Sequence, residues 1–238
     1  MAPSAGGGRA AHATTDELLD AFAARTAHTL GAGVGVAGGY ASLLREQHAG
    51  QLDAEGIEAL GALEGGLGRL RLVVEDLLEL SALAARELCV GPVDTAAAVA
   101  AATAGLRAPL RAARVELEVG ALPPLGGDPA LVERLFQHRI RGAVAAIGRG
   151  PGVVAVTGRR HGAEVHLEVA DDGAPRGPDG AEGLFAPVAT PRGGGPLVGA
   201  GVSMAICRRI AERHGGSVSA RAGERAGATV AVVLAEAA

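Results

Sequence analysis

The chain of 238 residues carries a formal net charge of −4 at neutral pH, and 48% of its residues are hydrophobic. This length and composition are enough to bury a core in one large domain or two small ones, so we expect a globular protein. The acidic balance and the absence of a dense basic run argue against nucleic-acid binding. No apolar stretch reaches the ~18–20 residues needed to cross a membrane, and no signal peptide begins the chain, so we expect a cytoplasmic protein without membrane contact.

Two features of the composition limit the chemistry. Cys89 and Cys207 lie far apart without a metal-ligand spacing, which predicts reduced, packed thiols and no metal site. The chain contains neither lysine nor asparagine. Any mechanism that needs a catalytic lysine is therefore excluded, and the absence of asparagine argues against a nucleotide site that depends on that side chain.

The N-terminal part is predicted to be a tail followed by a helical hairpin. Residues 1–14 are small and lack apolar periodicity, which is typical of a disordered tail. A first helix is expected from Thr15 to about His48, although the five glycines between Gly31 and Gly39 each cost roughly 1 kcal/mol relative to alanine in a helix interior. That stretch therefore needs tertiary support or is kinked. The apolar residues expected on one side of this helix are Leu18, Leu19, Phe22, Leu30, Ala37 and Leu44.

A second helix is predicted from about Leu52 to Glu87. Its apolar residues follow a heptad pattern, which requires partner helices. They are Leu60, Leu63, Leu67, Leu70, Val74 and Leu77. The hairpin over residues 15–89 favours a homodimer with a four-helix bundle, and the alternative is that the hairpin docks on the following domain of the same chain.

Residues 90–238 form a second region, which begins near Gly91-Pro92. Helices are expected at Asp94–Arg111 and from Asp128 to about Ile147. Strands and helices alternate here without a regular βαβ order. The predicted fold class is therefore α+β, with the helical hairpin followed by an α/β sandwich that has a mixed, mostly antiparallel sheet. The expected strands include Val115–Val119, Val153–Thr157 and Glu164–Ala170, the last two joined by a turn at Gly158–Gly162.

A glycine-containing segment, Gly199-Ala200-Gly201, opens an amphipathic helix that continues to His214. Glycines at a helix entrance let backbone N–H groups approach a phosphate, and the helix N-terminus adds partial positive charge. Two alternating runs follow this helix, Ser217–Arg221 and Thr229–Leu234. The pattern predicts a nucleotide-phosphate site at the start of the helix.

Five segments of the chain, taken in order, carry a family resemblance. They are Phe22–Leu44 around His28, Gly127–Gln137, Val169–Gly173, Leu184–Pro187 and Gly199–Met204. They resemble the phosphoacceptor segment, the asparagine box, the first half of the Asp-x-Gly-x-Gly box, the phenylalanine box and the second glycine box of two-component sensor histidine kinases. The resemblance covers nearly the whole chain from residue 15 and implies a Bergerat (GHKL-type) ATP-binding fold after the hairpin.

The resemblance also implies roles for individual residues. His28 stands where the phosphorylated histidine would be. Asp171 corresponds to the aspartate that accepts a hydrogen bond from the adenine amino group, and Gly173 would let the base approach. Equally, Asp171 could simply end a strand and form a turn with the two residues that follow. Gly199 and Gly201 would lie beside the nucleotide phosphates, and Thr190–Pro196 occupies the place of the mobile ATP lid.

Two departures from the family pattern affect Mg²⁺-ATP. At the positions where the family carries its metal-binding asparagine and its neighbour four residues earlier, this chain has Gly142 and His138. Because glycine offers no ligand and Mg²⁺ prefers oxygen donors to imidazole, we expect ATP to bind with low affinity and without the usual coordination of Mg²⁺. Arg139 and Arg141 could contact the phosphates directly, so Arg141 and His138 are candidate nucleotide-binding residues, although solvent-facing arginines are the favoured interpretation.

Three further departures affect the remaining motifs. Thr29 follows His28 where the family has an acidic residue that takes the proton of the histidine. Gly33 replaces a proline of the phosphoacceptor helix. Pro175 replaces the second glycine of the Asp-x-Gly-x-Gly box, which removes a backbone N–H donor.

These observations lead to two functional hypotheses. The first is a degenerate histidine kinase that forms a homodimer and engages a response regulator receiver domain or a partner histidine kinase. The alternative is an active phosphoryl-transfer enzyme that uses His28, either as a weak autokinase or as a histidine phosphotransferase. In the second hypothesis a response regulator, rather than bound ATP, is the expected phosphate donor.

Overall fold

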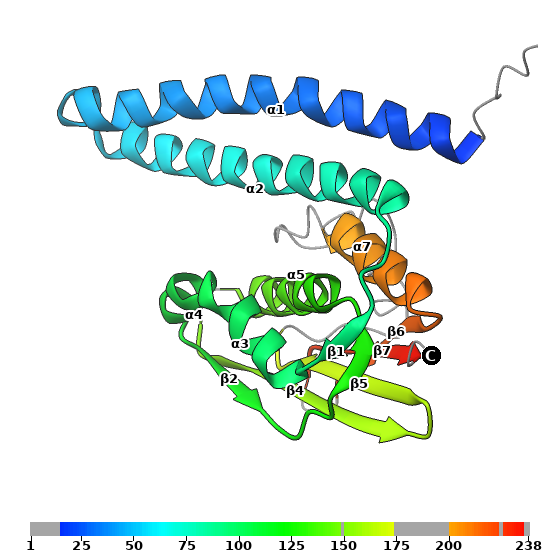
Figure 1. The fold of residues 1–238 in the computed structure, drawn as a ribbon. Coiled ribbons are helices and arrows are strands. Elements are labelled where there is room, and N and C mark those ends of the chain that lie inside the picture. Colours follow the sequence, from blue (N-terminus) through cyan, green and yellow to red (C-terminus); the bar gives the residue numbers. More distant parts are fainter. Residues whose placement is uncertain (1–14, 149, 174–199, 224–225, 236–238) are drawn as a thin grey trace, which may run out of the picture.

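The computed structural model describes residues 15–148, 150–173, 200–223 and 226–235. In Figure 1 helix α1 lies on helix α2, α2 lies on a group of shorter helices, and these cover one face of a β-sheet. The predicted tail over residues 1–14 lies outside the described residues. So do Leu184–Pro187, Thr190–Pro196, Pro175 and Gly199.

The first two helices form an antiparallel hairpin. Helix α1 (Thr15–His48) and helix α2 (Ala54–Ala85) are joined by one short 3-10 turn, η1 (Ala49–Gln51). Asp53 caps α2, because its carboxylate accepts a hydrogen bond from the backbone N–H of Gly56 at 2.8 Å. Near the turn, Nε of Arg45 lies 2.7 and 2.8 Å from the two carboxylate oxygens of Glu64, which ties the two helices together.

Small residues of α1 line the contact with α2. Ala27 and Ala41 are buried there, and a Cβ on Gly31 would lie only 3.2 Å from Cγ1 of Val74. This close approach supplies the tertiary support that the glycine-rich stretch needs, and α1 remains one continuous helix. The apolar side expected for α1 does not make this contact: Leu30 and Leu44 are exposed, as is Ala37, and the side chains of Leu18, Leu19 and Phe22 lie outside the described residues.

Only some of the apolar residues in the heptad pattern of α2 are buried within one chain. Leu60 and Val74 are buried and Leu67 is half-buried, whereas Leu63 and Leu70 are 49% and 48% exposed. Residues seven positions apart share one helix face, so one row of the pattern is packed, while the other faces outward at Leu63 and Leu70 and is half-buried at Leu77.

Helix α2 also docks on the second region of its own chain. It packs against α7 (Ala200–Arg213) and reaches α5 (Pro129–Ile147). At its C-terminal end, Arg213 of α7 donates hydrogen bonds to the backbone carbonyl oxygens of Leu83 and Arg86. Docking of the hairpin within the chain is therefore observed, and it leaves the row of Leu63 and Leu70 uncovered.

The second region is built on a five-stranded sheet with the strand order β2-β4-β5-β7-β6. Strands β2 and β4 are parallel and the other neighbours are antiparallel, so the predicted mixed, mostly antiparallel sheet is confirmed. A separate pair of short antiparallel strands, β1 (Gly91–Val93) and β3 (Leu125–Gly127), lies beside it. The five strands are β2 (Val115–Val119), β4 (Gly152–His161), β5 (Glu164–Asp171), β6 (Ser217–Ala222) and β7 (Ala228–Ala235).

Two expected elements differ from the structure. The helix predicted at Asp94–Arg111 is two helices, α3 (Thr95–Ala104) and α4 (Arg107–Ala113), because the chain breaks at Gly105, a residue with poor helix propensity. The turn predicted at Gly158–Gly162 is shorter, since Gly158 pairs with Leu167 inside the sheet and the strand continues to His161.

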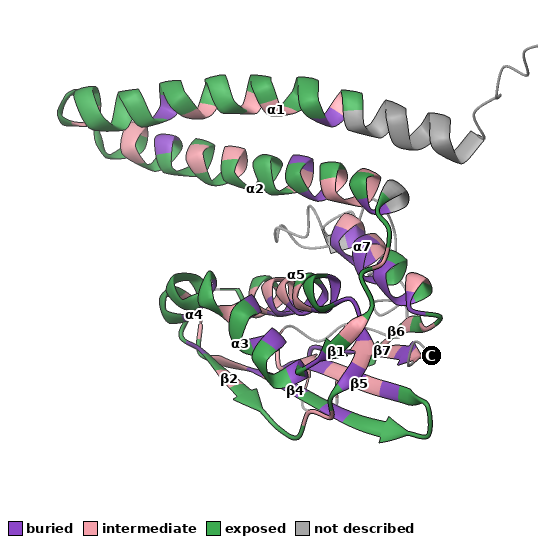
Figure 2. Ribbon diagram, viewed as in Figure 1, coloured by how far each residue is buried: buried purple, intermediate pink, exposed green. Residues whose placement is uncertain are grey.

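The core lies between the sheet and helices α5 and α7. Alternate residues of the central strands point toward these helices, and Figure 2 shows that buried residues are concentrated here while the hairpin is mostly exposed. No described helix is both long and apolar enough to cross a membrane. The strand residues of the core include Val154, Val156, Val165, Leu167, Val169, Val230, Val232 and Leu234.

One polar junction fixes the end of the hairpin, the start of α5 and the end of α7. The carboxylate of Asp128 caps α5 by accepting hydrogen bonds from the N–H groups of Ala130 and Leu131, and it also accepts from Arg86 and from the N–H of Cys89. Burial opposes the charge, but these hydrogen bonds and the Arg86 guanidinium hold the pKa of Asp128 below its ordinary value.

His214, at the end of α7, closes the same junction. Its Nε2 accepts a hydrogen bond from the backbone N–H of Asp128 at 3.0 Å, and its Nδ1 lies 2.8 Å from the carbonyl oxygen of Ile210. The ring is buried, so both nitrogens need these partners.

The two thiols have different surroundings. Cys207 is buried, and burial raises its pKa to about 11, which matches the packed thiol that the sequence predicts. Cys89 is exposed, so the prediction of a packed thiol is wrong at that position, where the chain leaves α2 for β1.

Candidate functional site

The predicted adenine-binding aspartate ends strand β5. Asp171 is buried, and its Oδ1 accepts a hydrogen bond from the backbone N–H of Gly173 at 3.2 Å. The neighbouring Asp172 turns the other way, and its Oδ1 accepts from the N–H of Val153 on β4 at 2.8 Å. The two adjacent carboxylates therefore differ in their contacts: Asp172 binds the turn to β4, whereas Asp171 is buried.

Glycine backbone surrounds the Asp171 carboxylate. A Cβ on Gly173 would lie 2.8 Å from the carbonyl oxygen of Ala146 on α5, and a Cβ on Gly227 would lie 2.4 Å from Oδ1 of Asp171. Any side chain at either position would displace the aspartate or the end of α5. The backbone therefore approaches this carboxylate from two sides.

The two candidate residues on α5, His138 and Arg141, form a row with Arg134 that faces α2. Arg134, His138 and Arg141 are spaced four and three residues apart, which places them on one face of the helix. His138 is almost completely buried, and its Nδ1 lies 3.1 Å from Oγ of Ser203 on α7 and 3.1 Å from the guanidinium of Arg141. The structure thus brings His138 and Arg141 together, and Ser203 joins them.

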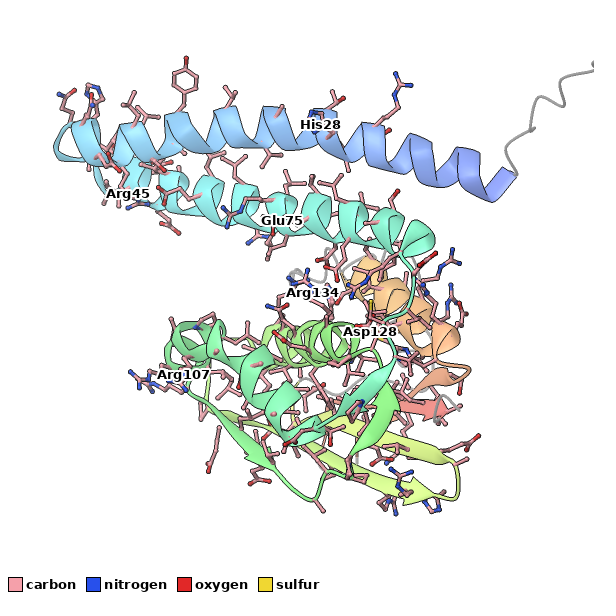
Figure 3. The ribbon with its side chains drawn as sticks, in the orientation of Figure 1. His28, Arg45, Glu75, Arg107, Asp128 and Arg134 are labelled. Carbon is pink, nitrogen blue, oxygen red and sulfur yellow. The ribbon has the colours of Figure 1, made fainter. Side chains whose placement is uncertain are left out.

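Two carboxylates of α2 meet this row. Asp76 is buried, and its oxygens lie 2.6 and 2.8 Å from Nη2 of Arg141. One turn later, Oε2 of Glu79 lies 3.2 Å from Nε2 of His138, and Oε1 of Glu79 accepts a hydrogen bond from Nε of Arg134 at 3.0 Å. Figure 3 shows Arg134 extending between α5 and α2. We call these five residues the α2–α5 charge cluster.

The charges of the cluster shift the ionisation of Glu79. Burial alone would raise its pKa, but hydrogen bonds from His138 and Arg134 outweigh burial and lower the pKa of Glu79 to about 2. The same contact raises the pKa of Arg134, with burial opposing the shift. Both groups are therefore fully charged near neutral pH.

Arg139 does not face the solvent, so the favoured interpretation of that side chain is wrong. It is 5% exposed and extends toward Met204 of α7, whose sulfur accepts a hydrogen bond from Nη1. Its guanidinium also covers Gly142, because a Cβ there would lie 3.6 Å from Nη1. The third residue after Arg139 on a helix lies on the same face, so the missing side chain at position 142 leaves the room that the guanidinium fills.

His28 lies apart from these residues. It is exposed on α1, and α2 separates α1 from the helices of the second region (Figure 3). The next residue, Thr29, bonds its hydroxyl to the carbonyl oxygen of Arg25 one turn earlier. Gly201 is buried in the first turn of α7, and Gly199 lies outside the described residues.

Comparison with known proteins gives one consistent result. Residues 127–238 match the family described as histidine kinase-, DNA gyrase B- and HSP90-like ATPase. Histidine protein kinase DivJ of Caulobacter vibrioides is 28% identical over 90% of this chain, and the chain spans 36% of the length of DivJ.

Two solved structures are similar over 92% of the chain, each with a TM-score of 0.64. One is the crystal structure of full-length ShkA in complex with AMPPNP, at 23% identity and covering 47% of that chain. The other is the crystal structure of histidine kinase ThkA in complex with response regulator protein TrrA, at 19% identity and covering 62% of that chain. Both likenesses include the hairpin as well as the sheet. The domain match and the curated kinase relatives place the chain in the two-component histidine kinase family.

Membership of the histidine kinase family agrees with the motif order and the fold expected from the sequence. The predicted helical hairpin followed by a mixed α/β domain is confirmed. Coverage of about a third of DivJ means that this chain corresponds to only part of such a kinase.

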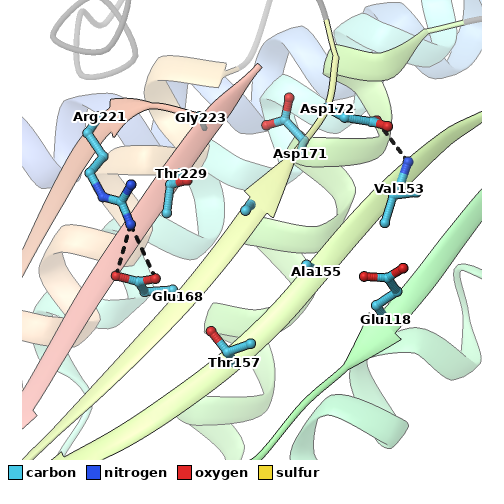
Figure 4. A pocket seen from close by; sticks show the side chains of 11 residues that line it. Glu118, Val153, Ala155, Thr157, Glu168, Asp171, Asp172, Arg221, Gly223 and Thr229 are labelled. Atoms are coloured by element: carbon cyan, nitrogen blue, oxygen red, sulfur yellow. Dashed lines mark hydrogen bonds and ion pairs between the residues drawn. The ribbon is translucent and has the colours of Figure 1, made fainter. Parts of the chain in front are cut away.

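A hollow of about 220 Å³ lies on the sheet face that the described helices leave open, and it is distinct from the α2–α5 charge cluster (Figure 4). Thr157 and Ala155 line it, alternating along β4 with the buried Val154 and Val156. Two of its charged residues are paired within the sheet, since Glu168 accepts hydrogen bonds from Arg221 at 3.3 and 3.4 Å.

Asp76, Glu79, Arg134 and Ser203 are site residues that the sequence analysis did not predict. The signal was present for the two carboxylates: three acidic residues, Glu75, Asp76 and Glu79, interrupt an apolar stretch of α2 from Leu72 to Leu83. Charges on an otherwise packed helix face require partners, but the sequence does not say where those partners lie.

Proposed function

We propose that this chain is a degenerate member of the histidine kinase family that binds ATP weakly and without the usual Mg²⁺ coordination. The observation that supports this proposal is that the residues of α5 at the expected Mg²⁺ site offer no suitable oxygen ligands. Gly142 provides no ligand, the guanidinium of Arg139 fills the space beside it, and the imidazole of His138 is held by Ser203 and Glu79. These donors do not fit Mg²⁺, which prefers oxygen ligands in octahedral geometry.

The adenine side of the site retains Asp171 and Gly173 of the Asp-x-Gly-x-Gly box. The buried carboxylate of Asp171 would accept the hydrogen bond from the adenine amino group, with Gly173 leaving room for the base, and the family match over residues 127–238 supports this assignment. The N-terminal turn of α7, around Gly201, would receive the phosphates. Bound ATP would supply a γ-phosphoryl group, and the contribution of the chain is to bind and orient the nucleotide.

Calorimetric titration with ATP in the presence of Mg²⁺ or of EDTA tests this proposal. We expect weak binding that changes by less than about twofold when Mg²⁺ is removed. Asp171→Asn keeps the shape of the side chain and should weaken ATP binding by about tenfold, because a neutral amide oxygen is a weaker hydrogen-bond acceptor than a buried carboxylate. Glu116→Ala, on the exposed face of β2, is the matched control. Tenfold tighter binding with Mg²⁺ would instead indicate an ordinary kinase site.

We further propose that the chain forms a homodimer through its hairpin and engages a response regulator receiver domain or a partner histidine kinase. The exposed row of Leu63 and Leu70 supports dimerisation, since buried partners are expected for a heptad pattern. A two-component signalling role for this chain would then depend on protein contacts more than on its own kinase chemistry.

The second candidate function is phosphoryl transfer through His28. Its exposure on α1 favours this candidate, because a receiver domain can reach an exposed imidazole without any ATP site. In this step the imidazole nitrogen attacks the phosphorus of an aspartyl phosphate, and the aspartate leaves as a carboxylate. Incubation with a phosphorylated receiver domain should label wild type and His48→Ala, but not His28→Ala. Equal labelling of all three proteins would remove His28 from the mechanism.

A further inference from the structure

The α2–α5 charge cluster places negative charges of the hairpin against positive charges of the α/β domain. Two cations of α5 are engaged: Arg134 pairs with Glu79 of α2, and Arg141 pairs with Asp76. The imidazole of His138 lies between them, with its Nε2 3.2 Å from Oε2 of Glu79. Asp76 and His138 are 4% and 2% exposed, whereas the side chains of Arg134 and Arg141 are 45% and 29% exposed. The contact is therefore buried at its centre and open to solvent at its ends. Buried charges of this kind are stable only while they are paired.

The two arginines and His138 form a surface suited to an extended anion. Positions 134 and 141 are separated by seven residues, or about 10 Å along the helix axis. A single phosphate cannot span this distance, whereas an oligophosphate with several charges can contact all three side chains. When α2 moves away, the row exchanges two carboxylates for water or for such an anion.

A hollow gives access to one end of the cluster. It measures about 330 Å³ and lies between α2 and α5, where Glu79, Arg86, Glu133 and Arg134 line it. An anion in this hollow would meet the pair of Glu79 and Arg134 first. The contact can therefore be displaced stepwise from this end.

We propose that Asp76 and Glu79 act as built-in competitors of the phosphate groups of the nucleotide, so that the docked hairpin blocks the cations of α5 and the undocked hairpin frees them. This inference rests on the proposed function, because the nucleotide supplies the phosphates. Competition for the same cations couples the two events in both directions: ligand binding favours release of α2, and release of α2 strengthens ligand binding by the same factor.

Inorganic tripolyphosphate is the probe that tests the competition without the adenine. The double variant Asp76→Asn and Glu79→Gln removes the negative charges while preserving shape. If nine molecules in ten are docked, the variant should bind tripolyphosphate about tenfold more tightly than wild type does. Glu75→Gln is the matched control, because Glu75 lies next to the cluster on α2 but is paired with Arg71 of the same helix at 3.6 Å. Calorimetry on all three proteins gives the comparison.

Charge removal on the other side should have the opposite effect. Arg141→Gln should weaken tripolyphosphate binding, and Arg107→Gln, an exposed arginine of α4, should leave it unchanged. Unchanged or weaker binding in the double variant, or equal effects of the two arginine variants, would overturn the proposal. So would a failure of tripolyphosphate to bind to any of the proteins.

Hydrogen exchange gives a readout on the wild-type chain, which keeps the test independent of the folding of the variants. Saturating tripolyphosphate should accelerate exchange of the α2 amides near Asp76 and Glu79, and unchanged or slower exchange would contradict the competition. A different result would contradict the proposed function. If ATP binds no more tightly than tripolyphosphate, and Asp171→Asn does not change the affinity for ATP, the adenine site is absent. The competition would still stand on the tripolyphosphate results.

Discussion

At the scale of single residues, His214 and Asp128 show how one polar contact joins distant segments. The imidazole of His214 accepts the backbone N–H that begins α5, 86 residues earlier in the chain. Without the ring this buried N–H group has no partner. We expect His214→Ala to lower the free energy of unfolding by about 1–3 kcal/mol, measured by urea denaturation. His161→Ala, on the exposed tip of β4, should have little effect, and equal losses would contradict this account.

A second prediction at this scale concerns Glu79 and the pH dependence of the free energy of unfolding. Its pKa in the folded protein is lowered to about 2 from an ordinary value of 4.5. The unfolded chain therefore takes up a proton first as the pH falls, and the stabilisation by Glu79 is present above about pH 4.5 and disappears toward pH 2. The difference in unfolding free energy between wild type and Glu79→Gln should shrink over this range. A difference that does not change with pH would refute the charged contact.

At the scale of elements, the glycines of α1 are of two kinds. A Cβ on Gly31 would press on Val74, whereas nothing lies within 4 Å of a Cβ on Gly35. Gly35→Ala should therefore raise the free energy of unfolding by about 0.5–1 kcal/mol, since alanine loses less backbone entropy on helix formation. Gly31→Ala should gain less or destabilise, and Val74→Ala should restore the gain in the double variant. Thermal unfolding of wild type, the three single variants and the double variant tests this pairing, and equal gains at both glycines would contradict it.

The elements also show what sequence patterns can predict here. Helix α5 was recognisable because Asp128-Pro129 is a strong start signal and an apolar face follows, and the sheet strands were recognisable from their alternation. The packed face of α1 was not, because alanine and glycine carry little apolar signal even when they form the contact. The charge cluster was unpredictable from the sequence for a different reason: Asp76 and Arg141 are separated by 65 residues, and only the docking of α2 brings them together.

At the scale of the whole molecule, the proposed dimer depends on the outward-facing row of α2. Leu63→Glu combined with Leu70→Glu places charges in this row, which should convert a wild-type dimer to a monomer because unpaired charges are costly to bury. Light scattering coupled to gel filtration measures the mass directly. Val119→Glu, an exposed apolar position on β2, is the control. A monomeric wild type, or a double variant that remains dimeric, would contradict the proposal.

The attachment of α2 at one end has a mechanical consequence. Its C-terminal end is fixed by Arg213, while its N-terminal end, at the turn with α1, lies 31 residues or about 46 Å away. Asp76 and Glu79 lie only about 10–14 Å from the fixed end. The helix therefore acts as a lever with unequal arms: a displacement of about 4 Å at the hairpin turn moves the two carboxylates by about 1 Å. Ionic contacts of 2.6–3.2 Å are sensitive to changes of this size. A weak force that moves the hairpin turn over a large distance can therefore act at the two carboxylates as a stronger force over a small distance.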